Sequence, residues 1–382
     1  MIVLSEDQEL LLASVREYCA DPSTKELVAQ AAAEKRLARE VWDGAAKLGF
    51  IGISTPEEYG GGGFDLVTEC LLIEEFVKAG NPFASMLVAH NLGLKCLYYC
   101  GTEEQKQKYL VPMATGKYLC SSAFTDPAGS FNFKEWSISF EPDGDEVVVN
   151  GGKVMVTQAD DGDVKFVFAM NYADDTVLKG LIIDKDIPGI TSALQTKLLP
   201  RNDGWGSLSF SDVRIPAENV VDTSACTIPY LAPGFLEVGL SGLLTAQASF
   251  GLAFNYATQR TRYGKPLTNL QKVAHRLVDM GIKVEAARAL IYEAAQNWDA
   301  GNYQYAERLC LMAKVFGTEV GNAVAHDALI LHGGAGYTPE LPIGGIFANS
   351  IALEIAEGAN DILRDFIAET YGIKPGWKNG EV

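Results

Sequence analysis

The sequence predicts an α+β protein with an N-terminal helical domain (residues 1–118), a middle antiparallel β domain (119–228) and a C-terminal four-helix bundle (229–382). Two observations predict this class. Apolar residues recur every three or four positions in the first and last parts, but they alternate in the middle part. The chain has 382 residues, 48% of them hydrophobic, so it is long enough for two or three parts with large buried cores.

The N-terminal part begins with a helix that Ser5 is expected to cap, because Gln8 stands at the capping-box position. A second helix is expected from about Glu34 to Leu48, ending at Gly49. Further helical periodicity is found near residues 66–79, 85–100 and 102–115.

The middle part carries a strong hairpin signal between Glu146 and Thr157, with Asn150-Gly151 at the expected turn. No long helix is expected in this part. Further strands are expected at residues 165–170, 178–184 and 207–214.

The C-terminal part returns to helical periodicity in longer segments, and the second of them has the apolar spacing of an antiparallel bundle. The most apolar stretch, Val238 to Phe254, is interrupted by polar residues, and we interpret it as a buried helix rather than a membrane span. The expected helices cover residues 237–261, 269–298, 303–331 and 360–371.

Composition excludes several classes of function. A formal net charge of −18 argues against nucleic acid or an anionic membrane as a partner. The seven cysteines contain no Cys-x-x-Cys and indicate reduced thiols in a cytoplasmic protein. Four histidines without a tight cluster predict no metal site. The first residues lack the basic and apolar regions of a signal peptide.

The strongest chemical candidate is Glu357-Gly358, which follows the glycine-rich segment His332 to Tyr337 by twenty residues. A carboxylate with backbone room beside it suits removal of a weakly acidic C–H proton. A glutamate beside a glycine at a helix end is also a common structural feature. The run Gly60 to Gly63 lacks the Lys-Ser/Thr of a phosphate-binding loop, so we interpret it as a turn.

Several short segments, in the same order along nearly the whole chain, resemble the acyl-CoA dehydrogenase family. Each match alone is weak, but six or more in order are strong. The segments are Leu48 to Gly61, Gly101 to Leu110, Phe124 to Ser130, Asp212 to Val220, Arg260 to Gln271 and His332 to Tyr337.

The resemblance implies FAD-dependent α,β-dehydrogenation of an acyl-CoA thioester to a 2-enoyl-CoA, with electrons passed to an electron-transfer flavoprotein. It also implies a tetramer, with identical or different subunits. Glu357 stands where the family carries its base in a Glu-Gly motif. A dry pocket would raise the pKa of such a base.

The resemblance also assigns binding roles. Arg260, in one segment with Tyr263, matches an arginine that binds the FAD pyrophosphate of a neighbouring subunit. The adenine half is assigned to Gln271, Gly333 and Gly334, and the flavin ring to Phe124, Thr125, Met155 and Thr157. Substrate contacts are expected from Ser130, His90, Asn91 and Gly358. Each of these residues also has an ordinary structural explanation, and His90 is more often a satisfied helix histidine than a catalyst.

The chain departs from the family pattern at several of these positions. Met155 replaces a tryptophan that stacks on the flavin, Ala359 replaces a threonine after the Glu-Gly pair, and Phe131 replaces an aspartate. Either the cofactor pocket is altered, or the chain is one subunit of a heteromeric dehydrogenase with shared FAD sites. A flavoenzyme of the same fold that reduces or dehydrates an acyl-CoA, and a non-catalytic subunit that keeps the fold, are further alternatives.

Overall fold

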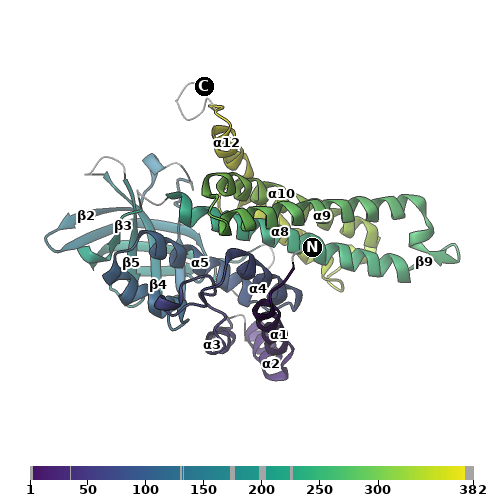
Figure 1. Ribbon diagram of the computed structural model, residues 1–382, viewed down its shortest axis with the longest axis horizontal. Coiled ribbons are helices and arrows are strands. Elements are labelled where there is room, and N and C mark those ends of the chain that lie inside the picture. Colours follow the sequence, from purple (N-terminus) through teal and green to yellow (C-terminus); the bar gives the residue numbers. More distant parts are fainter. Residues whose placement is uncertain are drawn as a thin grey trace. The chain divides into compact units, whose positions relative to one another are not determined.

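The computed structural model describes residues 3–34, 36–129, 131, 133–172, 177–197, 204–223 and 227–374. The chain divides into two compact units, Met1–Leu231 and Ala232–Val382. The first unit holds the N-terminal helices together with the sheet, and the second holds the long helices of the C-terminal part (Figure 1). The expected division of the first unit at residue 118 coincides with the change from helix to strand and stays a prediction.

The N-terminal helices follow the capping signals in the sequence. Ser5 caps the first helix as predicted: the Gln8 amide donates to Ser5 Oγ (3.2 Å), and the Ser5 amide donates to Gln8 Oε1 (3.0 Å). The helices are α1 (Glu6–Ala20), α2 (Pro22–Glu34), α3 (Arg39–Lys47), α4 (Leu66–Lys78) and α5 (Phe83–Cys100), followed by the consecutive turns α6 (Glu103–Gln105), η2 (Lys106–Leu110) and α7 (Val111–Ala114).

The expected helix from Glu34 to Leu48 is wrong at its start, because α3 begins at Arg39 and a separate helix, α2, precedes it. The Asp21 carboxylate accepts from the amides of Ser23 (2.8 Å) and Thr24 (3.2 Å), and Pro22 occupies the first helical position. An aspartate followed by proline is a helix start signal.

The strands of the first unit form one sheet in the order β6-β7-β3-β2-β4-β5-β8, with β1 beside β4. Strand β1 runs parallel to β4, and β2 meets β4 in parallel; the other described pairs are antiparallel. The strands are β1 (Cys120–Ala123), β2 (Ser139–Asp143), β3 (Glu146–Val156), β4 (Val164–Asn171), β5 (Val177–Asp184), β6 (Ile190–Leu194), β7 (Gly206–Pro216) and β8 (Val220–Val221).

The predicted hairpin turn at Asn150-Gly151 is wrong, since β3 runs through both residues. The hairpin instead joins β2 to β3, pairing Asp143 with Glu146. Gly151 has φ +123°, lies at a register shift against β7, and leaves no room for a Cβ, which would approach Ser137 O to 2.4 Å. The glycine therefore permits a bulge and a close backbone contact rather than a turn.

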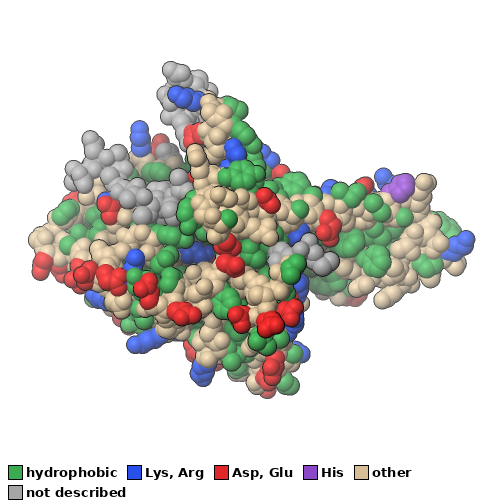
Figure 2. All heavy atoms as spheres, in the orientation of Figure 1, with side chains coloured by type: hydrophobic (Ala, Val, Ile, Leu, Met, Phe, Trp, Pro, Cys, Tyr) green, Lys and Arg blue, Asp and Glu red, His purple; other side chains and the backbone are tan. Residues whose placement is uncertain are grey.

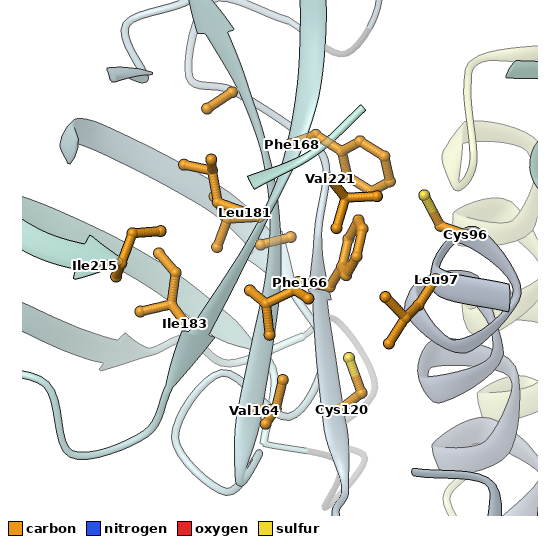
Figure 3. Close-up of a cluster of buried hydrophobic side chains, with 14 of the residues drawn as sticks. Cys96, Leu97, Cys120, Val164, Phe166, Phe168, Leu181, Ile183, Ile215 and Val221 are labelled. Atoms are coloured by element: carbon orange, nitrogen blue, oxygen red, sulfur yellow. The ribbon is translucent and has the colours of Figure 1, made fainter. Parts of the chain in front are cut away.

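The core of the first unit lies between the sheet and α5. Figure 3 shows Cys96 and Leu97 of α5 facing Phe166 and Phe168 of β4, which are fully buried. Strand β4 is an almost continuous apolar run because both of its faces are covered. Acidic side chains gather on the visible surface of this unit (Figure 2), in a chain whose formal net charge is −18.

The second unit is built from long helices that run side by side (Figure 1). Helices α8 and α10 touch through their backbones: a Cβ on Gly239 would meet Ala313 O at 2.5 Å, and one on Gly242 would meet Gly317 O at 2.4 Å. The helices are α8 (Thr227–Gln259), α9 (Gln271–Asp299), α10 (Tyr303–His332), α11 (Ile343–Ile355) and α12 (Asn360–Thr370). The sequence did not predict α11.

Helix α8 is long and apolar enough to cross a bilayer, with a mean hydropathy of 1.2 over its most apolar window. Within the protein, however, 61% of that window is buried, and the helix packs against α10 through its glycines. These are the properties of a core helix in a bundle.

Candidate active site

Glu357 lies in the short turn between α11 and α12, and its backbone is left-handed. Its φ is +50°, and Gly358 follows with φ +94°. A left-handed backbone is unfavourable for a residue with a Cβ by about 1–2 kcal/mol. Such strain in a non-glycine residue is concentrated at functional sites, so the conformation of Glu357 makes this turn a candidate functional site.

The turn is held by Lys314, a lysine in the middle of α10 that is 0% exposed. Its Nζ donates to the carbonyl oxygens of Glu354 (3.1 Å) and Gly358 (2.7 Å) and to Oδ1 of Asn360 (2.8 Å). An ammonium group has three N–H donors, so three acceptors satisfy it fully. One buried cation thus contacts the last turn of α11, the Glu357 turn and the first residue of α12.

The two charged groups shift each other's protonation. Burial raises the pKa of the Glu357 carboxyl, and the positive charge of Lys314 opposes part of this rise. Burial lowers the pKa of Lys314 to about 8, against the effect of the neighbouring carboxylates, first among them Glu357. A half-buried carboxyl with a raised pKa is suited to exchange a proton near neutral pH.

The residues that the sequence assigned to the pyrophosphate and the adenine lie together at one end of the second unit. The end of α8, the start of α9 and the end of α10 meet there, and the Tyr256 and His332 rings stack with centroids 4.5 Å apart. Arg260, Gln271 and Tyr263 are exposed at this end. Gly333 and Gly334 follow the last residue of α10, and a Cβ on either would meet nothing within 4 Å.

Tyr263 occupies the tip of a small hairpin formed by β9 (Thr261–Arg262) and β10 (Lys265–Pro266). Tyr263 and Gly264 both have positive φ, +53° and +76°, as two-residue hairpin turns require. The Tyr263 ring is 88% exposed, with the guanidinium of the neighbouring Arg262 5.8 Å from its centroid.

The structure does not bring this end of the bundle together with Glu357. Lys314, which holds the Glu357 turn, lies in the middle of α10, and Gly333 directly follows the end of this helix. The nineteen residues between the two positions correspond to about 28 Å at 1.5 Å per residue. One copy of the second unit therefore presents the carboxylate and the exposed arginine at separate places.

The residues assigned to the flavin ring lie together in the first unit. The Val154 amide donates to Thr125 O (2.9 Å), which places Phe124-Thr125 beside the end of β3. A register shift against β7 gives Met155 a φ of +59° and leaves it 55% exposed, and Thr157 follows directly after the strand. The bulge directs the Met155 side chain out of the sheet.

The sequence reasoning missed Lys153, which supports this flavin-side segment from within. Lys153 is 0% exposed, its Nζ donates to Phe124 O (2.6 Å), and it lies 3.5 Å from the centroid of the Trp136 ring. Burial lowers the pKa of Lys153 to about 6, and Asp126 opposes part of that shift. A charged residue among inward-facing apolar positions was the available signal, for Lys153 in β3 and for Lys314 in α10.

His90 and Asn91, assigned to the substrate, are buried in α5 and bonded within the first unit. His90 Nδ1 accepts from the Cys120 amide (3.0 Å), and burial lowers the pKa of His90 to about 3. Asn91 Nδ2 donates to Glu69 Oε1 (3.2 Å). Both have structural partners, and their contact with a substrate stays a prediction. Ser130 lies outside the described residues.

Comparison with known proteins agrees with this architecture. Residues 5–117 match the model of the acyl-CoA dehydrogenase N-terminal domain, and residues 231–372 match that of the C-terminal domain. A probable acyl-CoA dehydrogenase of Bacillus subtilis, YngJ, is 30% identical over 377 residues, which cover 96% of this chain and 98% of that protein. The chain belongs to the acyl-CoA dehydrogenase family.

Two further similar proteins are relevant to the cofactor and to the direction of the reaction. Subunit CarC of the caffeyl-CoA reductase-Etf complex of Acetobacterium woodii is 29% identical over 96% of its own length and 94% of this chain. A solved structure of PigA with FAD and proline is 26% identical, with a TM-score of 0.88 over 98% of this chain and 99% of that one. The acyl-CoA dehydrogenase fold predicted from the sequence is thereby confirmed, and the chain is an oxidoreductase of a FAD-dependent family.

The residues present fit FAD. The Arg260 guanidinium pairs with no carboxylate among the described residues, so it is available to a pyrophosphate. Open space surrounds Gly333 and Gly334. In the first unit, no protein group in the described part of the chain hydrogen-bonds the hydroxyls of Thr125 or Thr157, which leaves these donors for a ring with polar edges.

Proposed function

We propose that this protein oxidises an acyl-CoA thioester to a 2-enoyl-CoA, with FAD as cofactor and an electron-transfer flavoprotein as electron acceptor. The observation that carries the proposal is the Glu357 turn. A carboxyl with a raised pKa stands on a residue with a strained backbone conformation, and a buried ammonium group bonds the carbonyl of the next residue in that turn. Nothing in helix packing alone requires an ionisable side chain at this position.

In this proposal Glu357 removes the proton from the α-carbon of the thioester. The pocket must be dry, because a desolvated carboxylate is a stronger base than a hydrated one. Gly358, which carries no side chain, leaves room for the substrate beside the base. FAD, when bound, supplies the acceptor for the hydride that leaves the β-carbon.

Two groups of residues, described separately above, would bind FAD. Phe124, Thr125, Met155 and Thr157 would border the flavin ring, and Arg260, Tyr263, Gln271, Gly333 and Gly334 would hold the pyrophosphate and adenine. Since about 28 Å of α10 separates Lys314 from Gly333, we infer that Arg260 serves a site whose base comes from another subunit. Identical and different subunits both satisfy this arrangement.

A second candidate is the reverse reaction, reduction of a 2-enoyl-CoA. It is favoured by the similarity to a subunit of a caffeyl-CoA reductase complex and by Met155 and Ala359, which remove an aromatic ring and a hydroxyl from the expected flavin surroundings. The raised pKa of Glu357 is compatible with this direction too, because a protonated carboxyl can return the proton to the α-carbon.

Anaerobic titration of the FAD-loaded protein tests both candidates. Short, branched, cyclic and aromatic acyl-CoAs are added to the oxidised protein, and the matching 2-enoyl-CoAs are added after chemical reduction. Bleaching of the flavin absorbance by an acyl-CoA supports dehydrogenation, and recovery of colour with an enoyl-CoA alone supports reduction. The Glu357→Gln variant should keep its FAD and respond to neither, and full activity of that variant would refute the assigned base.

A further inference from the structure

We propose that Lys314 is a positioning residue for Glu357: its buried ammonium group fixes the turn that carries the carboxylate and supplies the positive charge that keeps the carboxylate ionised. This inference rests on the proposed function, because it assumes that Glu357 is the base. It adds a second ionisable residue, on a different helix, to the machinery of proton transfer.

The geometry of the contacts is the first support. Lys314 donates to Glu354 O before the turn, to Gly358 O within it and to Asn360 Oδ1 after it. Glu354 belongs to the last turn of α11, where carbonyl oxygens have no partner in the helix. The ammonium group therefore caps α11 and ties α12 to the same point, so that Glu357 between them has little freedom to move.

Asn360 extends the anchor into α10. Its Nδ2 donates to Thr318 Oγ1 (3.1 Å), one helical turn after Lys314, while its Oδ1 accepts from Lys314. The Asn360 side chain is thereby fixed at both atoms, and it is buried. A fully satisfied polar network of this kind selects a single arrangement of the turn.

The charges around Lys314 make it the main cation near the base. On α10 itself Glu319 pairs with Arg364 of α12 (2.5 Å), so that arginine is already engaged. On α11 the Glu354 side chain accepts from Asn322 (2.6 Å). Helix α8 contributes the buried Glu237, two residues from Gly239, which lies against the α10 backbone at Ala313 and Lys314.

Burial lowers the pKa of Lys314 to about 8, so its loss of a proton should be visible on the alkaline side of the pH–rate profile. Below this pH the group has three donors for its three acceptors. Above it, a neutral amine has only two, and the charge that favours the Glu357 carboxylate is lost. The rate of proton abstraction should therefore fall on both sides of an optimum, with Glu357 responsible for the acid limb and Lys314 for the alkaline limb.

The test compares Lys314→Met with Lys283→Met, a lysine of α9 that faces Asp327 (3.7 Å) instead of the turn. Rates of flavin bleaching by an acyl-CoA are measured by anaerobic stopped flow between pH 5.5 and 9.5 with FAD-loaded protein. For Lys314→Met we expect at least a tenfold lower rate, an acid limb displaced upward by on the order of one pH unit, and no alkaline limb near pH 8. Lys283→Met should keep the profile of the unaltered protein.

Three results separate the possible failures. If an acyl-CoA still bleaches the flavin absorbance of Glu357→Gln, the proposed function fails. If the flavin of Glu357→Gln is not bleached, but the pH profile of Lys314→Met keeps its acid and alkaline limbs unchanged, the role of Lys314 is refuted while the proposed function stands. If Lys314→Met does not fold, Asn360→Asp decides, because a carboxylate 2.8 Å from Nζ should offset the positive charge that acts on Glu357 and displace the acid limb in the same direction. An unchanged acid limb in Asn360→Asp would overturn the inference.

Discussion

At the scale of single residues, burial shifts the pKa values of Glu357, Lys314 and Lys153. The sequence identified the first from its motif. The burial of the two lysines was not predicted, because a residue's charge does not reveal whether its helix or strand face is buried. Burial depends on contacts with distant segments, and a single sequence does not provide them.

The raised pKa of Glu357 predicts a pH-dependent cost to stability. The folded protein binds this proton more tightly than the unfolded chain, so folding loses stability as pH rises from the ordinary glutamate value of 4.5 through the folded pKa. Glu357→Gln, which cannot ionise, should gain melting temperature relative to the unaltered protein across this window. Thermal melting in a pH series measures the difference between the two, and a difference independent of pH would contradict the prediction.

Lys153 predicts the opposite trend. Its pKa is about 6 in the folded protein against 10.5 in the unfolded chain, so stability should rise with pH between these values. Each pH unit in this window is worth up to about 1.4 kcal/mol. The melting temperature of the unaltered protein, relative to Lys153→Met, should increase from pH 6.5 to 9. Lys134→Met, at an exposed lysine, is the control and should show no such trend.

At the scale of elements, long periodic segments were predictable and junctions were not. The bundle helices lie within a few residues of their expected bounds, apart from the earlier start of α8, because their apolar spacing persists over many turns. The Asn150-Gly151 pair was misread as a turn because a bulge and a hairpin both use a glycine with positive φ. Helix α11 was missed because Gly344-Gly345 and Asn349-Ser350 interrupt its apolar residues, which show little periodicity.

The contact between α8 and α10 predicts opposite effects for two glycine substitutions. A Cβ on Gly317 would meet Gly239 O at 2.5 Å, so Gly317→Ala should push the helices apart and destabilise the protein by about 1–3 kcal/mol. A Cβ added to Gly251 of α8 would meet nothing within 4 Å. Gly251→Ala should therefore stabilise the helix by about 0.5–1 kcal/mol. Chemical denaturation of the two variants side by side distinguishes packing from helix propensity. Equal changes in the free energy of unfolding would contradict this prediction.

At the scale of the whole molecule, family and cofactor were predictable because several motifs stood in order along the chain. The substrate was not, because pocket shape depends on which side chains converge from separate helices. The direction of the reaction was not predictable either, since the same carboxyl can take or return a proton.

Sharing of sites between subunits is testable by complementation. Arg260→Ala should lose FAD, and Glu357→Gln should keep FAD but lack turnover. In mixed oligomers of the two chains, a site with Glu357 from one chain and Arg260 from the other is intact, so about half of the hybrid sites should work. Co-expression with two different affinity tags isolates the hybrids. If each arginine serves its own chain, the hybrids will be as inactive as their parents.

The Lys314 ammonium, bonded on both sides of the Glu357 turn, also has a consequence for local opening. The end of α11 and the start of α12 cannot fray independently while one cation bonds to both. Their amide protons should therefore exchange with deuterium as one cooperative group, at a common opening free energy. Replacing that lysine by methionine should split the group into two segments that exchange at different rates, even in protein that never meets a substrate.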